Sequence, residues 1–469
     1  MSFLSYNVIA IESQHSFDLG KVANVLMTIR LFGKTKERFS ALFSLFAFLA
    51  LSPVLASENI YTPATVRIDL LRHLRGAGTI SIWSDSGMTV SAAGGSHFDI
   101  QQSTPTTVKA DESAEISVEA PQQHLRNFQD ESLTFTPKPG TPISIASGAG
   151  LPKFERSYRG TIVISNAGGA LQAVNIVPVE DYLCGVVGAE IGANAPVEAL
   201  KAQAIAARTY TLSNLNKLAS INCDLDDTTR CQNYAGVIGE TDRCCAAVHD
   251  TAGQVLIYDG KLVEALYSTD AGGVTACDVT GTRPYFQAVP DSVNGNVFGI
   301  GQPNHDWTLI VNRAELIAAL QTNPISSVQT FSSLNIDGYD RSGRITTVTI
   351  KAANGESKTV SGPRFREIMG PDKLKSTKAT MIDAPDGSFV FKGEGWGHGF
   401  GMSQRGAIAL ASTPNNFTYQ QILEKYYVGA TIETAATAQK PTVSAFRPLP
   451  SPPLVYVGRS FEQASRLKP

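Results

Sequence analysis

The sequence predicts an α+β protein that is rich in β structure and contains one long helix. Short runs of alternating apolar and polar residues, such as residues 79–83, recur between clusters of Ser, Thr, Gly and Pro. The 40 glycines and the 8% aromatic content are typical of turns and strands rather than of helical bundles. One strong helical pattern starts at residue 195 and continues to about residue 217. We therefore expect a β-rich mixed domain built around this helix.

Turn signals predict three hairpins and the start of the helix. Residues 157–177 contain two strand-like runs around an Asn-Ala-Gly-Gly turn, and residues 254–267 contain two runs separated by Asp259-Gly260. A third hairpin signal lies at residues 344–350. Asn194 is expected to be the N-cap of the long helix, with Pro196 in its first turn.

Charge and motifs exclude several classes of protein. The 469 residues carry 39 Lys+Arg and 42 Asp+Glu, a net charge of -3, which removes the bulk attraction expected of a nucleic-acid binder. No P-loop and no H-E-x-x-H motif is present, and the glycine-rich segment 393–401 does not satisfy G-x-G-x-x-G. We therefore expect no organic cofactor.

The N-terminal segment has the pattern of an export signal. Basic residues at 34–38 precede residues 39–57, which carry no charge and end with Pro53 and the small-residue sequence Val54-Leu55-Ala56. Cleavage is expected after Ala56, with Met27 as an alternative start. An uncleaved membrane anchor is the other interpretation of the apolar run. In both cases the rest of the chain is expected in the periplasm or cell envelope.

Export makes the six cysteines candidates for disulfide bonds. We expect disulfides to pin the polar stretch that contains Cys223, Cys231, Cys244 and Cys245, with three pairings open. Zinc is the alternative, but no His stands at the usual finger spacing, so no metal is assigned. Cys184 is expected to be a buried small hydrophobic residue.

Two cations and one carboxylate form the first candidate site. Lys201 and Arg208 stand seven residues apart on the predicted helix and therefore share a face. Because the residues between them are mostly small and uncharged, this stripe predicts a groove for a polar or anionic ligand, with solvated surface charges as the alternative. Glu190 lies in a Gly-Ala-Glu-Ile-Gly turn that can project it into the same groove.

The segment 393–401 has Gly at every second position. If it is extended, Glu394, Trp396, His398 and Phe400 share one face, and another part of the chain can approach the glycine face closely. A structural role for His398 is the alternative to a catalytic one.

At these residues the sequence resembles the SpoIID family, over about residues 158–411. The matching parts occur in family order: PVEDYLCGVVGAEIGANAPVEALKAQAIAARTY, CQNY with GQVLIYDGK, YSTDAGGVTA, VSGPRFREIMG and GWGHGFGMSQRGA. The resemblance implies a mixed α and β domain that cleaves bacterial cell-wall glycan as a lytic transglycosylase. It also implies a preference for glycan strands whose stem peptides an amidase has removed.

The resemblance assigns roles to individual residues. It implies that Glu190 is catalytic and that Lys201 and Arg208 contact the substrate. The other matched motifs place Tyr267, Gly273, His398 and Gln404 among the substrate-binding residues.

The chain also departs from the family pattern. Ile191 and Gly192-Ala193 replace the usual Met and Pro after the glutamate, and Tyr267 stands at the position of a family histidine. Asp226 stands where zinc-binding members have their first Cys, which argues against a zinc site.

Together these features predict four regions. They are a signal peptide at residues 1–56, a β-rich region at 57–150, a SpoIID-like catalytic domain at 151–435 and a flexible Pro-rich tail at 436–469. Residues 57–150 are either an extension of the catalytic fold or a separate docking domain. The expected partners are peptidoglycan strands and a cell-wall amidase, with membrane contact if the signal segment stays uncleaved.

One carboxylic acid is enough for the implied reaction, because the nucleophile is the C6 hydroxyl of the sugar itself. Glu190 is expected to protonate the departing oxygen and then to deprotonate that hydroxyl, with its pKa raised by apolar neighbours such as Val187 and Ile191. Lys201 and Arg208 are expected on the far wall of the groove. A carboxylate in open solvent, or turned away from both cations, would remove the enzyme mechanism and leave only the alternative, a noncatalytic glycan-binding protein that recruits or activates an amidase.

Overall fold

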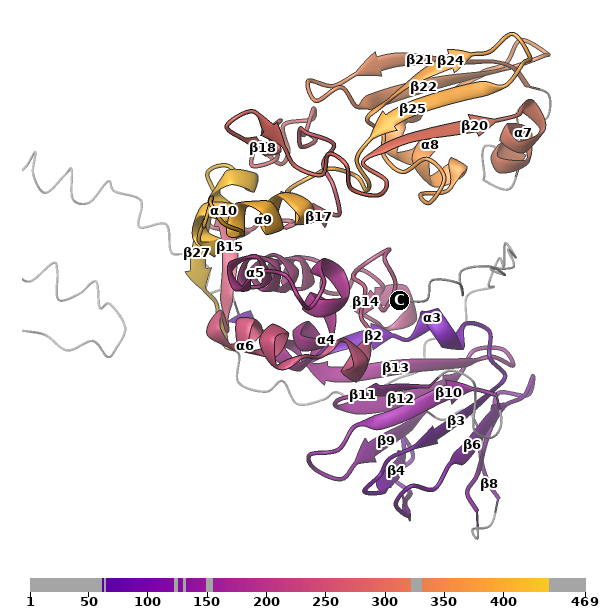
Figure 1. Ribbon diagram of the computed structural model, residues 1–469. Helices are drawn as coiled ribbons and strands as arrows, with labels where there is room; N and C mark the ends of the chain where they lie inside the picture. The colour runs from indigo at the N-terminus through magenta and orange to yellow at the C-terminus, as the bar shows by residue number, and fades with distance from the viewer. Residues whose placement is uncertain are drawn as a thin grey trace, which may run out of the picture. The chain divides into compact units, whose positions relative to one another are not determined.

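The computed structural model describes residues 61–62, 65–121, 125–129, 132–148, 155–321 and 331–437. Strands and helices are mixed throughout, which confirms the predicted β-rich α+β class (Figure 1). The predicted signal segment lies outside the described residues, as do residues 438–469 of the predicted tail. In the described ranges no helix is long and apolar enough to cross a membrane.

Two mostly antiparallel sheets form the first part of the described chain. One has the strand order β14-β2-β13-β12-β9-β4-β5 and the other β11-β10-β3-β6-β7-β8. Buried residues of both sheets belong to one hydrophobic core. The strands are β2 Thr65–Asp69, β3 Thr79–Trp83, β4 Met88–Ala92, β5 His97–Ile100, β6 Thr106–Ala110, β7 Glu115–Glu119, β8 Arg126–Gln129, β9 Leu133–Pro137, β10 Ile143–Ser147, β11 Arg156–Tyr158, β12 Thr161–Asn166, β13 Leu171–Pro178 and β14 Leu225–Asp226.

Segments before and after residue 150 build the same two sheets. β11 pairs with β10, and β12 pairs with β9. The predicted hairpin at residues 157–177 contains the antiparallel pair β12 and β13, with Asn166 opposite Leu171. The short helix α3 (Leu71–Leu74) follows β2 directly.

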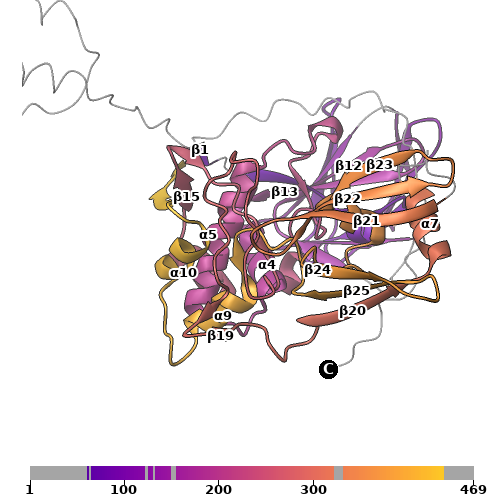
Figure 2. The same ribbon diagram turned by 90° about the horizontal axis from the view of Figure 1, so that it is seen from above.

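Two packed helices follow β13. α4 spans Val179–Ile191 and α5 spans Val197–Ser213, and Figure 2 shows them beside each other. The N-cap of α5 is Pro196, so the prediction of Asn194 was wrong. A residue that precedes proline is disfavoured in the helical region, and this delays the start of the helix.

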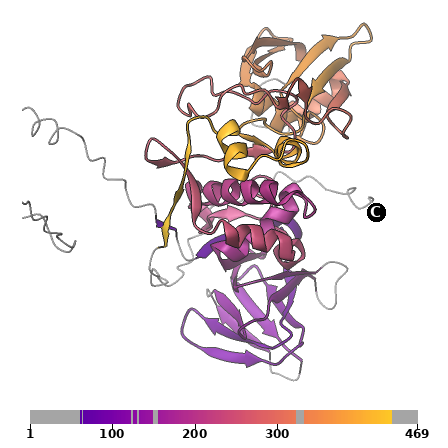
Figure 3. The ribbon, with the colours of Figure 1, turned by 60° about the vertical axis from the view of Figure 1, so that its left-hand side comes forward.

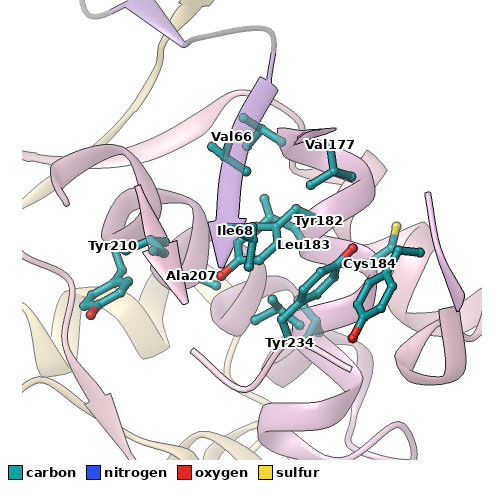
Figure 4. Packing of buried hydrophobic residues seen from close by; sticks show 14 of the residues in the cluster. Val66, Ile68, Val177, Tyr182, Leu183, Cys184, Ala207, Tyr210 and Tyr234 are labelled. Atoms are coloured by element: carbon teal, nitrogen blue, oxygen red, sulfur yellow. The ribbon is translucent and has the colours of Figure 1, made fainter. Parts of the chain in front are cut away.

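Tyrosines and aliphatic residues pack around both helices. Tyr182 and Leu183 of α4 lie near Ile68 of β2 in Figure 4, and Tyr234 packs against Tyr182 with ring centroids 4.8 Å apart. All four side chains are fully or almost fully buried. Burial of this kind fixes where the end of α4 lies relative to the loop around Tyr234.

The Asp259-Gly260 turn forms as predicted, joining β15 (Gln254–Tyr258) to β16 (Lys261–Leu262). β27 (Thr431–Thr434) pairs with the other edge of β15, and Figure 3 shows it as a yellow strand. The first two residues of the predicted tail form β28 (Ala436–Thr437), which pairs with β1 (Tyr61–Thr62).

A second hydrophobic core is built from the part of the sequence between residues 268 and 402. β17 (Tyr267–Ser268) pairs in parallel with β26 (Met402–Ser403). In the sequence, the sheets β20-β25-β24 and β21-β22-β23 come between these two strands (Figure 2). Their buried residues form a separate hydrophobic cluster. The elements are β20 Asp306–Val311, α7 Arg313–Gln321, β21 Phe331–Tyr339, β22 Ile345–Ala352, β23 Ser357–Ser361, α8 Gly362–Met369, β24 Ala379–Asp383 and β25 Phe389–Glu394.

The remaining elements are short and lie around the main helices. They are the 3-10 turns η1 Ala219–Ile221 and η2 Gly236–Gly239, α6 Asp242–Asp250, the hairpin β18 Ser292–Val293 and β19 Asn296–Val297, α9 Gln404–Ala411 and α10 Tyr419–Tyr426. α9 and α10 both pack against α5.

The glycine-rich segment is not an extended strand, so this part of the prediction was wrong. β25 ends at Glu394, and Gly395, Gly397, Gly399 and Gly401 all have positive φ. The close approach expected at the glycines does occur. A Cβ on Gly401 would lie 2.0 Å from the Leu266 carbonyl oxygen, and one on Gly397 would lie 2.5 Å from the Ser268 Cβ. This segment is therefore a tightly folded loop held against residues 266–268.

Candidate active site

Glu190 lies in the last turn of α4 rather than in the turn that precedes α5. The helix ends at Ile191, and Gly192 follows with φ +89°. Glycine is favoured at such a helix end because it adopts positive φ without steric cost. The helix α4 therefore fixes the position of Glu190, and Ile191 and Gly192-Ala193, which replace the family Met and Pro, follow it in the chain.

Two segments bind the Glu190 carboxylate, one through each of its two oxygens. The backbone N–H of Asn233 donates to Oε1 at 2.6 Å, and Nε2 of Gln404, at the start of α9, donates to Oε2 at 3.3 Å. The Asn233 side chain also donates to the Ala189 carbonyl oxygen at 2.8 Å. Segments far apart in the sequence therefore fix both the end of α4 and its acidic group.

Tyr267 belongs to the same site, as predicted from its motif. Its hydroxyl donates to Oε1 of Gln232 at 2.8 Å and also acts on the pKa of Glu190. Gln232 is fully buried and donates to the Thr211 hydroxyl of α5 at 2.9 Å. A hydrogen-bonded chain thus connects the tyrosine beside Glu190 to α5.

Burial raises the pKa of Glu190 above the usual value for glutamic acid. The hydrogen bond from the Asn233 backbone opposes this effect most strongly, followed by Gln404 and by the charge of Arg72. The residue nevertheless keeps partial solvent exposure. Desolvation favours the protonated form of a carboxyl group, which is the form that a general acid needs.

Arg208 does not face a groove, so its predicted position was wrong. Its side chain is 0% exposed and forms a two-point ion pair with Glu180, at 2.9 and 2.6 Å. It also donates to the carbonyl oxygens of Val248 and Gln254. All of these partners are protein groups, which gives Arg208 a structural role inside the helical core.

Lys201 also points away from Glu190. Its ammonium group lies 3.0 Å from Oδ2 of Asp250, at the end of α6. Lys201 and Arg208 do share a face of α5, as predicted, but that face is turned to α6. Gln203, about 200° around the helix from Lys201, lies on the side of Gln404 and Glu190.

His398 is near the same tyrosine but is held as a neutral ring. Its Nδ1 accepts the Phe400 backbone N–H at 3.0 Å, and the ring contacts the Tyr267 backbone. Burial and the positive charges of Arg366 and Arg344 lower the pKa of His398 to about 4. The hydrogen bond from Phe400 gives this ring a place in the fold of the glycine-rich loop, and an imidazole with this pKa carries no charge at neutral pH.

Gly273 lies in a loop that packs against the β18–β19 hairpin. It has φ +87°, and a Cβ there would lie 3.1 Å from Cγ1 of Val297. Its carbonyl oxygen accepts the Asp291 backbone N–H at 2.9 Å. Of the predicted substrate-binding residues, Tyr267 and Gln404 therefore lie beside Glu190. Gly273 instead contacts Val297 and Asp291.

Three residues of the site were missed in the sequence. Arg72 comes from α3, in the region whose role was left open, and Asn233 belongs to the CQNY segment. Gln203 is 0% exposed and accepts a hydrogen bond from Gln404 at 3.3 Å. A glutamine among alanines of a buried helix is the signal that could have pointed to it, since such a polar group requires a partner.

Comparison with known proteins shows the family of this chain. The pattern of the SpoIID family, described as Stage II sporulation protein, matches residues 167–258. An uncharacterised protein of Brachyspira hyodysenteriae is 30% identical over 289 residues, covering 59% of this chain and 72% of the relative. The chain belongs to the SpoIID family.

Two relatives from Bacillus subtilis carry functional names. Stage II sporulation protein D is 28% identical, over 57% of this chain and 77% of the relative. The amidase enhancer is 29% identical over 53% of this chain, and the match spans 40% of that longer protein. The part matched by the SpoIID pattern includes Glu190, Gln203 and Asn233.

The cysteines of this SpoIID chain do not form the predicted disulfide-pinned loop. All six are free thiols. Cys223 lies beside Gln172, Cys231 beside Tyr210, Cys244 beside Gly188 and Cys245 beside Cys184, so none of the predicted disulfides forms. Cys184 is buried, as predicted. Within the described segments no group of three or more His, Cys, Asp or Glu residues is arranged to hold a metal ion.

A cavity of about 380 Å³ lies away from this site. It is lined by Gly76, Ala110, Asp111, Glu112, Gly168, Gly169 and Ala170, in loops of the two large sheets. None of these residues contacts Glu190, Gln404 or Tyr267. This cavity therefore plays no part in the acid–base chemistry proposed for Glu190.

Proposed function

We propose that this chain is an exported lytic transglycosylase, acting in the periplasm or cell envelope, that cleaves MurNAc–GlcNAc bonds of peptide-stripped peptidoglycan to 1,6-anhydro ends. The observation that carries the proposal is the Glu190 carboxyl group, whose pKa is raised by burial while the residue stays partly exposed. Membership of the SpoIID family supports a role in cell-wall metabolism.

The surroundings of Glu190 suit a mechanism with one carboxyl group. The groups that act most on its pKa are Asn233, Gln404, Arg72 and Tyr267, and none of these is a second carboxylate. Hydrolytic glycosidases generally need two carboxyl groups, one to protonate the leaving oxygen and one to serve as nucleophile or to activate water. An intramolecular hydroxyl removes the need for the second group.

In the proposed reaction Glu190 starts protonated. Its proton passes to the glycosidic oxygen as the C1–O bond breaks, so the departing sugar leaves with a hydroxyl group. The C6 hydroxyl of the same MurNAc residue then bonds to C1, and its proton returns to the Glu190 carboxylate. The acid is regenerated, and no water is consumed.

The orientation of Lys201 and Arg208 favours the second candidate function. A carboxylate turned away from both cations is the arrangement expected of a noncatalytic glycan-binding protein that recruits or activates a cell-wall amidase. A relative named amidase enhancer is consistent with that role. We retain the enzyme as the first proposal, because burial raises the pKa of Glu190 although the charge of Arg72 lowers it, and a Lys201 or Arg208 cation beside the carboxyl group would lower it further.

Digestion of peptide-stripped glycan separates the two functions. The wild-type protein should release products lighter by one water than those of hydrolysis, and Glu190→Gln should release none while remaining folded. Glu356→Gln, the same change at an exposed position, should keep full activity. If no wild-type product forms but wild type and Glu190→Gln bind glycan equally, the glycan-binding function is supported instead.

A further inference from the structure

Three side chains from three helices, Glu190, Gln404 and Gln203, form a chain of hydrogen bonds. Nε2 of Gln404 in α9 lies 3.3 Å from Oε2 of Glu190 in α4 and 3.3 Å from Oε1 of Gln203 in α5. Gln404 is 5% exposed and Gln203 is 0% exposed. Within the described ranges, Nε2 of Gln203 has no hydrogen-bond partner. A buried amide nitrogen without a partner is costly and calls for an explanation.

The arrangement satisfies one protonation state of Glu190. A carboxylate accepts hydrogen bonds and cannot donate, so the NH2 group of Gln404 suits the ionised form. The protonated acid needs an acceptor for its own O–H. The proposed reaction, on which this inference depends, requires both forms in every turnover.

We propose that Gln404 and Gln203 reverse their amide groups together as Glu190 changes its protonation state. The two ends of an amide have nearly the same shape, so each can turn without repacking. In the reversed arrangement Oε1 of Gln404 accepts from the Glu190 carboxylic O–H and from Nε2 of Gln203. The unpartnered nitrogen then gains its hydrogen bond, and both forms of Glu190 are satisfied.

Gln203 and Gln404 are positioning residues in this account. No proton passes through the amides, because the Glu190 proton goes to the glycosidic oxygen and returns from the C6 hydroxyl. The other groups that face the carboxyl are the Asn233 N–H, the Tyr267 hydroxyl and the charge of Arg72, and all three lower its pKa. A fixed Gln404 donor would add to their effect, whereas a reversible amide pair leaves burial as the dominant influence.

Side-chain amide NMR tests this directly. The NH2 signals of Gln404 and Gln203 are assigned by their disappearance in Gln404→Met and Gln203→Met. On lowering the pH through the Glu190 titration, the Gln203 NH2 should become hydrogen-bonded and the Gln404 NH2 should lose its bond to Glu190. Both changes should be absent in Glu190→Gln. If the amide signals stay constant while Glu190 titrates, the proposal is overturned.

Kinetics give a second and independent measurement. Gln203→Met should lower kcat on peptide-stripped glycan about tenfold, with KM changed by less than about twofold, because the acid is mispositioned while substrate contacts remain. An unchanged kcat would contradict the positioning role. A protein without glycan-cleaving activity would overturn the proposed function, yet the NMR experiment would still decide whether the amides reverse.

Discussion

Arg208 and Glu180 form a buried two-point ion pair that ties α5 to the first turn of α4. The guanidinium is 0% exposed, and the Glu180 side chain is 31% exposed. Since Glu190 closes the same helix α4, this pair helps to set the direction from which the acid enters the site. The contacts of Arg208 therefore support the scaffold that carries Glu190.

Removal of Arg208 should destabilise the fold. Arg208→Ala leaves Glu180 and two carbonyl oxygens without their donor, and loss of one partner of a buried pair typically costs about 3 kcal/mol or more. Urea unfolding should show this loss. Lys201→Ala, which removes a more exposed pair with Asp250, should cost less than about 1 kcal/mol. An Arg208→Ala protein of native stability that has lost glycan affinity would restore the substrate-binding role.

Asp69 should make the protein less stable at alkaline pH. It is 3% exposed in β2, and burial raises its pKa to about 7. Because the folded-state pKa lies above the unfolded value, the contribution to stability is full below about pH 4 and is lost as the pH rises through about 7. Asp69→Asn should therefore gain about 4 kcal/mol over wild type at pH 8 and little at pH 4. An equal difference at both pH values would refute this.

His398 should remain neutral throughout the physiological range. Its pKa is lowered to about 4 by burial and by Arg366 and Arg344. The folded pKa lies below the unfolded value, so this residue stabilises the protein above about pH 6.5 and progressively less as the pH falls toward 4. The imidazole NMR signal, assigned with His398→Gln, should not titrate above pH 5. A midpoint near 6.5 would show that the ring is open to solvent.

Gly401 should tolerate substitution much less than Gly260. Both have similar positive φ, +65° and +71°, so alanine adds roughly 1–2 kcal/mol of backbone strain at each. At Gly401 the new Cβ would also lie 2.0 Å from the Leu266 carbonyl oxygen, whereas nothing lies within 4 Å at Gly260. Gly401→Ala should therefore unfold in urea at least about 2 kcal/mol more easily than Gly260→Ala. Equal losses would mean that the loop can move away from Leu266.

The sequence predicted the fold class and two short hairpin turns, but it did not predict which residues surround Glu190. Alternation and turn residues are local signals, and they located β12, β13, β15 and β16. Helical periodicity correctly placed Lys201 and Arg208 on one face of α5 but could not show which neighbour covers that face. The hydrogen bonds of Glu190 with Asn233 and Gln404 join residues that are 43 and 214 positions away, and no local pattern encodes them.

The fate of solvent oxygen tests the central claim most directly. Peptide-stripped glycan is digested in water enriched in heavy oxygen, and the new MurNAc ends are analysed by mass spectrometry. Ring closure by the C6 hydroxyl, with Glu190 as the acid and base, predicts anhydro ends that contain no solvent oxygen and that disappear with Glu190→Gln. Incorporation of one heavy oxygen atom at each new end would show that water is the nucleophile, and would contradict the single-carboxyl mechanism.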